Sequence, residues 1–116
     1  MIAIIDYGLG NIKAIYAAYK NMNVPVKIAS HPSALESSDK FILPGVGAFD
    51  YAMKKLDKSG MRDTLDDLVQ TENKNILGIC VGMQMLTKSS EEGDRPGLGW
   101  LNAKVKKFNL NMNNFE

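Results

Sequence analysis

Four short apolar runs, separated by longer segments with helical spacing, most constrain what this chain can fold into. The runs cover residues 2–5, 25–29, 40–44 and 75–80. They are rich in Ile, Val and Leu, which is typical of strands that are buried on both faces of a parallel sheet. The first run stops at Asp6, close to two glycines, and the third stops at Pro44 and Gly45. Residues of these types end strands, so the turns support the same interpretation.

The segments between these runs carry apolar residues at the spacing of a helix. Asn11 is a suitable N-cap for a helix in which Ile12, Ile15, Tyr16 and Tyr19 share one face. Further helices are expected over residues 49–56, 61–72 and 81–88, and one more strand over residues 103–108. Strands that alternate with helices predict βαβ units, whose right-handed crossovers place helices on both faces of the sheet. We therefore predict an α/β fold of three layers, with a mainly parallel, flavodoxin-like sheet between helices.

Composition and charge exclude several classes of function. The chain has 116 residues, the size of about one small domain. Its net charge of +1 lacks the basic excess with which proteins bind nucleic-acid phosphates. No apolar stretch is long enough to cross a bilayer, and the first residues lack the basic region of a signal peptide. Cys80 is the only cysteine and His31 the only histidine. We therefore expect no disulfide within the chain, a cytoplasmic location, and neither a metal nor a cofactor.

One cysteine motif lies where the predicted sheet would place a ligand. Parallel strands end at a common edge, where ligands bind in folds of this type. Residues 78–82 read Gly78-Ile-Cys-Val-Gly82, the cysteine counterpart of a nucleophile elbow. A sharp turn there would expose Cys80, and the flanking glycines would avoid collisions with the backbone. The following helix N-terminus would stabilise a thiolate, and the Val81 N–H would face an oxyanion. A buried, unreactive Cys80 is the alternative interpretation.

Four segments together resemble a known family. They are Asp6-Tyr-Gly-Leu-Gly-Asn11, Pro44-Gly-Val-Gly47, Gly78-Ile-Cys-Val-Gly-Met-Gln84 and Ser90-Glu-Glu-Gly93. In this order and spacing the chain resembles the class I glutamine amidotransferases, most of all the glutaminase subunits of imidazole glycerol phosphate synthase. The resemblance covers residues 1–116 as the N-terminal part of a single amidotransferase domain. It implies that Cys80 attacks the carboxamide of glutamine to give a thioester and ammonia, and that water then releases glutamate.

The resemblance also implies roles for residues around the cysteine. The oxyanion would be held by the Val81 N–H and by a second N–H from the loop after the third strand, at Val46 with Gly47 beside it. Gly47 and Gln84 would line the glutamine pocket, and Glu92 would accept the amino group of glutamine. The alternative interpretations are a plain tight turn after the third strand and an ordinary solvated acid at Glu92.

The loop over residues 6–11 faces the partner synthase in this family. The resemblance therefore implies that Asn11 contacts a TIM-barrel synthase (cyclase) subunit, although an asparagine there also suits a simple helix cap. The glycines at positions 8 and 10 do not complete a dinucleotide-binding fingerprint, because Lys13 stands where the third glycine would be needed.

The sequence departs from the family in its acid–base group. The family uses a histidine in a His-Pro-Glu segment, which lies in a C-terminal portion that these 116 residues do not contain. His31 follows the second strand and is not a substitute by position. We therefore interpret the chain as the N-terminal part of a glutaminase and expect negligible turnover from it alone. Apolar faces left without the remaining strands would favour self-association, so we expect a non-monomer.

Other functions stay open on the sequence alone. A related amidotransferase subunit could feed ammonia to a sugar amidotransferase of a surface-polysaccharide locus. A non-catalytic subunit that docks a synthase is a second class, which the absent base favours and the cysteine motif opposes. A redox or chaperone-like protein with a cysteine elbow is a third class, but such proteins usually lack the Pro-Gly-Val-Gly loop and Gln84. A flavodoxin-like cofactor binder would need a Ser/Thr-rich phosphate loop that the sequence lacks.

Overall fold

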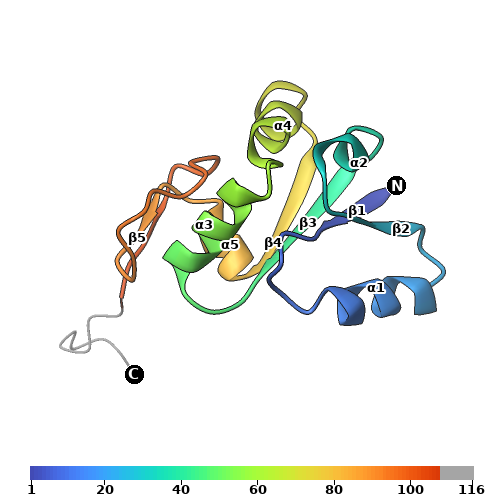
Figure 1. Cartoon of the computed structure of the whole chain (residues 1–116), viewed down its shortest axis with the longest axis horizontal. Coiled ribbons are helices and arrows are strands. Elements are labelled where there is room, and N and C mark those ends of the chain that lie inside the picture. Colours follow the sequence, from blue (N-terminus) through green and yellow to red (C-terminus); the bar gives the residue numbers. More distant parts are fainter. Residues whose placement is uncertain (108–116) are drawn as a thin grey trace, which may run out of the picture.

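The computed structural model describes residues 1–107 and is built on a sheet of four parallel strands (Figure 1). The strands are β1 (Ile2–Ile5), β2 (Val26–Ala29), β3 (Lys40–Gly45) and β4 (Asn75–Cys80). Their order across the sheet is β2-β1-β3-β4, and every neighbouring pair is parallel. The register places Ile4 beside Ile28 and Ile42, and Ile42 beside Leu77. The predicted parallel sheet is confirmed, with strand ends within one residue of the expected ones.

Helices cover both faces of this sheet, as predicted. On one face lies α1 (Ile12–Asn21) (Figure 1). Its apolar side chains pack against Ile4, Val26 and Ile42. The opposite face carries α2 (Pro32–Glu36), α3 (Phe49–Lys58), α4 (Arg62–Asp66) and α5 (Val81–Met85). None of the helices in the described part of the chain combines the length and the apolar character needed to span a bilayer.

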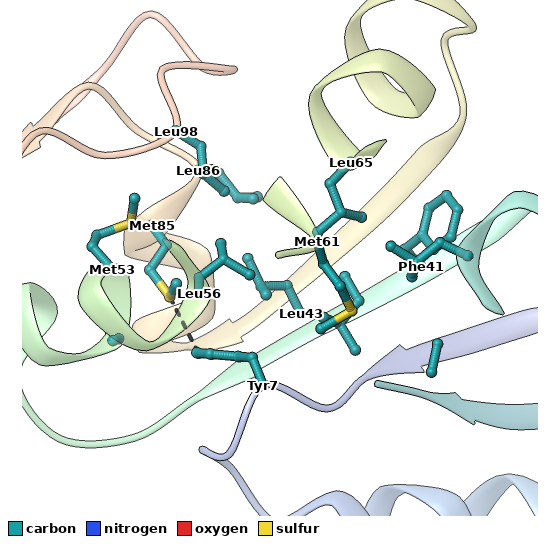
Figure 2. Packing of buried hydrophobic residues seen from close by; sticks show 14 of the residues in the cluster. Tyr7, Phe41, Leu43, Met53, Leu56, Met61, Leu65, Met85, Leu86 and Leu98 are labelled. Atoms are coloured by element: carbon teal, nitrogen blue, oxygen red, sulfur yellow. Dashed lines mark hydrogen bonds between the residues drawn. The ribbon is translucent and has the colours of Figure 1, made fainter. Parts of the chain in front are cut away.

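The main hydrophobic core lies between the sheet and the helices of this second face (Figure 2). Alternate strand residues such as Leu43 meet Met53 and Leu56 of α3 and Met85 of α5, all of them fully buried. Burying a side chain of this size contributes about 1.5–3 kcal/mol relative to leaving it exposed. This packing holds α3 and α5 over the carboxyl ends of β3 and β4.

Two helical segments differ from the prediction. No helix is predicted for the segment after β2 that contains His31, but this segment forms α2, with Pro32 in its first turn. Periodicity does not reveal a helix this short, because Leu35 is its one buried residue. The helix expected over residues 61–72 changes type, since α4 continues into a π-helical turn, η1 (Asp67–Thr71), which keeps Leu68 in the core.

The prediction that the helix after Cys80 extends to residue 88 is wrong. The backbone leaves the helix after Met85 because the carbonyl groups that follow accept hydrogen bonds from a returning segment. The Leu98 N–H donates to the Met85 oxygen, and the Gly97 N–H donates to the Lys88 oxygen, each at 2.8 Å.

The last described elements form a separate sheet of two parallel strands, β5 (Ser89–Ser90) and β6 (Lys104–Val105). The strand expected over residues 103–108 is thus shorter than predicted, and it pairs outside the central sheet. Phe108, at the end of that prediction, lies outside the described residues.

Candidate active site

Cys80 occupies a sharp turn between β4 and α5. Its backbone φ is +59° and its ψ is −128°, and its side chain is exposed. A non-glycine residue in such a conformation costs on the order of 1–3 kcal/mol, so the surrounding packing must impose it. This is the sharp turn that the motif predicts. The alternative of a buried Cys80 is wrong, because the turn presents the thiol at the carboxyl edge of the sheet.

The glycines on either side of Cys80 allow two backbones to approach closely. A β-carbon on Gly78 would lie 2.5 Å from the Cα atom of Met83 in α5. A β-carbon on Gly82 would lie 2.8 Å from the carbonyl carbon of Leu43 in β3, and closer still to its oxygen. Both obstacles are backbone atoms, which cannot rotate away. The two glycines therefore allow α5 to pack directly on β3 and β4.

The loop after β3 lies beside this turn. Gly45 is the parallel-sheet partner of Cys80, and a β-carbon on Gly45 would lie 2.9 Å from the Gly82 nitrogen. Val46, the next residue, is 50% exposed. Gly47 has a φ of +84°, with no atom within 4 Å of where its β-carbon would be. The structure thus brings Val46 and Gly47 next to the Cys80 turn, on a loop with open space around it.

Tyr7 ties three segments of the site together. Its buried hydroxyl donates a hydrogen bond of 2.6 Å to the Pro44 carbonyl oxygen and lies 3.3 Å from the Met85 sulfur, the contact dashed in Figure 2. Burial raises the pKa of Tyr7 well above its ordinary value. A β-carbon on Gly10 would lie 2.7 Å from the Pro44 β-carbon, so the loop after β1 also packs on the carboxyl end of β3. The three loops meet at one edge of the sheet, as expected.

Sequence reasoning did not single out Tyr7. The available signal was an aromatic residue directly after a buried strand, inside one of the segments that carry the family resemblance.

The remaining predicted substrate residues lie on different elements. Gln84 is half-buried in α5, four residues after Cys80. Glu92 is exposed in the loop after β5, where its N–H donates to the Ser90 hydroxyl at 3.2 Å. The structure therefore places Gln84 beside the cysteine turn along the chain, whereas Glu92 comes from a more distant loop.

Asp50 holds the loop that carries Glu92. Its carboxylate, in the first turn of α3, accepts hydrogen bonds from the Asp94 N–H at 2.8 Å and the Arg95 N–H at 2.9 Å. These bonds lower the pKa of the Asp50 carboxyl. Because α3 begins two residues after Gly47, Asp50 connects the loop after β3 with the Glu92 loop. Sequence reasoning missed Asp50, since its partners are 44 and 45 residues away along the chain.

Asn11 and His31 have clear local roles. Asn11 is exposed and caps α1, its side-chain oxygen accepting a hydrogen bond from the Ala14 N–H at 3.3 Å. His31 precedes α2, is exposed, and lies with its Nδ1 2.9 Å from the Ser33 hydroxyl. It follows β2, which is three strand positions from β4 and so about 14 Å across the sheet. The structure does not bring His31 to Cys80.

Within residues 1–107, no group of three or more His, Cys, Asp or Glu side chains is placed to hold a metal ion.

Comparison with known proteins gives the family. Residues 3–110 match the CobB/CobQ-like glutamine amidotransferase domain. The imidazole glycerol phosphate synthase subunit HisH of Bdellovibrio bacteriovorus is 55% identical over 108 residues, which are 93% of this chain and 53% of the relative. The HisH subunit of Leptospira interrogans is 51% identical over 114 residues, 98% of this chain and 56% of the relative. The chain thus spans about half the length of the curated relatives it matches.

A solved structure described as a glutamine amidotransferase shares the fold, with a TM-score of 0.74 at 24% identity, covering 90% of this chain and 55% of that one. Sequence family and fold agree, and the chain belongs to the CobB/CobQ-like glutamine amidotransferase domain family.

Proposed function

We propose that this chain carries the nucleophile of an ammonia-supplying glutaminase, of the kind named as a subunit of imidazole glycerol phosphate synthase. In this proposal it works in the cytoplasm, in histidine biosynthesis, as one member of a heterodimer with a TIM-barrel synthase subunit. The observation that carries the proposal is the Cys80 turn, which exposes a thiol beside the loop after β3 at the carboxyl edge of the sheet. The identity to HisH subunits supports the choice of acceptor reaction.

The proposed chemistry converts glutamine and water into glutamate and ammonia. The Cys80 thiolate forms a bond to the carboxamide carbon, and the carbonyl electron pair moves onto the oxygen. The Val81 N–H and a second backbone N–H, at Val46 with Gly47 beside it, stabilise that negative charge. The carbon–nitrogen bond then breaks, and the leaving amine takes up a proton to depart as ammonia. Water attacks the resulting thioester, glutamate leaves, and the thiol is regenerated.

Residues around the thiol and in the loop after β1 position the participants in this proposal. Gln84 and Gly47 line the glutamine pocket, and the Glu92 carboxylate pairs with the ammonium group of the substrate. Asn11 lies in the loop proposed to face the synthase subunit, and it caps α1 as well.

The acid–base group is the part of this chemistry that residues 1–116 do not provide. Protonating the amine and activating water both need such a group. His31 is the only histidine in the sequence, and it follows β2, the strand at the opposite edge of the sheet from β4, which carries Cys80. We therefore expect the 116-residue chain alone to release glutamate at a negligible rate. The same observation favours the second candidate, a subunit that docks a synthase without making ammonia.

Covalent labelling tests the proposed pocket separately from turnover. The chain is treated with an electrophilic glutamine analogue, and the labelled peptide is identified by mass spectrometry. We expect labelling at Cys80, protection by excess glutamine, and no label on the Cys80→Ser variant. Iodoacetamide needs only an exposed thiol, so glutamine should not slow its reaction.

Each outcome distinguishes the two candidates. If glutamine fails to protect Cys80 from the analogue, there is no glutamine pocket and the docking subunit is favoured. Rapid glutamate release by the chain alone would contradict the argument from the missing base.

A further inference from the structure

The backbone on both sides of Glu92 is held by hydrogen bonds. Each N–H group from residue 91 to residue 95 has an acceptor. The first three donate to acceptors in β5 and β6, at 2.9–3.2 Å. The other two, of Asp94 and Arg95, donate to the side chain of Asp50. Among these acceptors Asp50 is the one that belongs to α3, so it joins the loop after β5 to the main part of the fold.

The Asp50 carboxylate uses both of its oxygens in this contact. Oδ2 accepts from the Asp94 N–H at 2.8 Å, and Oδ1 accepts from the Arg95 N–H at 2.9 Å. Hydrogen bonds to an ionised acceptor are roughly twice as strong as those between neutral groups. The fit is also tight, because a β-carbon on Gly93 would lie 2.8 Å from the carboxyl carbon of Asp50. The loop therefore rests directly on the carboxylate.

The helix that carries Asp50 is itself fixed relative to the thiol. It begins two residues after Gly47, and its buried side chains pack with Met85 of α5, the helix that starts directly after Cys80 (Figure 2). Moving Asp50 relative to Cys80 would disturb this buried packing, which costs free energy. The two hydrogen bonds of Asp50 therefore set the position of the Glu92 loop relative to the thiol.

The Glu92 side chain stays available to a ligand. It is exposed, and among residues 1–107 no hydrogen bond or ion pair engages its carboxylate. The nearest cation along the chain, Arg95, pairs with Asp57 instead, at 3.6 Å. Asp57 follows Asp50 by two turns of α3, about 10 Å farther along the helix axis. A carboxylate with an anchored backbone and no cationic partner is suited to recognise an ammonium group.

We propose that Asp50 is a positioning residue for substrate selection. By holding the backbone on the C-terminal side of Glu92, it sets where the Glu92 carboxylate meets the ammonium group of an α-amino acid amide. This inference rests on the proposed function, in which Glu92 pairs with that group. It goes further, because it makes the preference for an amide with an α-ammonium group depend on a residue that does not itself contact the substrate.

Two chloroketones test the proposal on the 116-residue chain. One carries the α-amino and carboxyl groups of glutamine, and the other is identical but lacks the amino group. With each, the Cys80 thiolate forms a carbon–sulfur bond and chloride leaves, and mass spectrometry gives the labelling rate. We expect the unchanged chain to prefer the amino form about tenfold or more.

Asp50→Asn should lower this preference about fivefold or more and leave the rate with the other chloroketone unchanged. Asparagine has one oxygen where the carboxylate has two, so its NH2 group would face one of the two N–H donors. A merely structural role of Asp50 would change the rates of both chloroketones alike.

Asp63→Asn is the matched control, because Asp63 is also an acid in the first turn of a helix, α4, and is exposed. It removes the same charge and should keep the full preference. Gly93→Ala tests the contact from the loop, since its β-carbon would push the loop away from an intact Asp50 carboxylate. It should lower the preference as Asp50→Asn does. Circular dichroism and the iodoacetamide rate verify that each variant is folded with an exposed thiol.

The proposal is overturned if Asp50→Asn and Gly93→Ala keep the preference of the unchanged chain, if they slow both chloroketones equally, or if Asp63→Asn lowers the preference as much. Glu92→Gln separates this result from a failure of the proposed function. A preference that Glu92→Gln abolishes and Asp50→Asn keeps would overturn this inference alone. A complete lack of preference in the unchanged chain would also overturn it, and the proposed glutamine pocket fails with it if glutamine gives no protection.

Discussion

Replacing Tyr7 with phenylalanine removes a single buried oxygen atom from the centre of the candidate site. The ring stays in the core, but the Pro44 carbonyl loses its 2.6 Å hydrogen bond and Met85 loses its polar neighbour. A typical hydrogen bond contributes about 0.5–1.5 kcal/mol, and a buried acceptor left unpaired costs about 1–3 kcal/mol. We therefore expect Tyr7→Phe to lower the free energy of unfolding by about 1–2 kcal/mol near neutral pH.

The same substitution should become harmless in alkali. Burial raises the pKa of Tyr7, so the folded chain keeps the phenol proton at pH values where the unfolded chain has lost it. The folded state then binds more protons than the unfolded state, and the free energy of unfolding falls as pH rises above about 10. One pH unit above that value costs about 1.4 kcal/mol. Phenylalanine does not titrate, so the unchanged chain and Tyr7→Phe should become equally stable near pH 11, about one unit above the ordinary tyrosine pKa.

Urea unfolding followed by circular dichroism, at low and equal protein concentration between pH 7 and about 11, measures this difference. Tyr51→Phe is the matched control, because Tyr51 is exposed and removing its hydroxyl should change stability little. If the gap between the unchanged chain and Tyr7→Phe stays constant with pH, then the buried phenol is not what ties the loops together.

Three further substitutions test other parts of the site. Gly82→Ala places a β-carbon against the Leu43 backbone, so we expect a loss of about 3 kcal/mol in urea unfolding together with slower labelling of Cys80. Gly60→Ala is the control, because a β-carbon at Gly60 would meet no atom within 4 Å. Its free energy of unfolding should fall only by the cost of a left-handed backbone, about 1–2 kcal/mol. Equal losses in the two variants would argue against a clash at Gly82. Asp50→Asn should lower the protection of the Asp94 and Arg95 N–H groups against hydrogen exchange, measured relative to the intrinsic rate at each pH, and the same protection in the unchanged chain should fall as pH falls through the lowered pKa of Asp50. Unchanged protection of these two N–H groups would show that the Asp50 carboxylate does not hold the loop after β5 in place. Asn11→Ala should cost about 1 kcal/mol in the same unfolding assay through loss of the α1 cap, whereas Asn11→Ser should keep the cap and weaken only synthase binding in a pull-down.

The sheet was predictable because each strand is signalled locally. Residues 2–5 and 75–80 are apolar runs next to glycine-containing turns, and burial on both faces leaves such runs few other structures. The Cys80 turn was predictable for a similar reason. Gly78 and Gly82 lie only two residues from Cys80, so the local motif already indicates that the backbone of α5 packs closely on β3 and β4.

Features set by contacts between distant residues were not predictable in this way. Helix α5 stops at Met85 because carbonyl groups after it bond to residues 97–101, which no local periodicity encodes. Asp50 looks like any acid in the first turn of a helix until the loop after β5 closes on it. A short helix such as α2, with one buried leucine, has too little pattern to be detected.

The geometry of the candidate site depends on a small part of the fold. The Cys80 conformation is imposed by the pairing of β3 with β4, by the close approach at Gly82, and by the Tyr7 hydroxyl, all within the described residues. These contacts position the nucleophile within residues 1–107, whereas proton transfer needs an acid–base group that residues 1–116 do not supply. It follows that glutamine-protected labelling of Cys80 and turnover of glutamine should be separable, since labelling needs only the positioned thiol and turnover also needs the acid–base group.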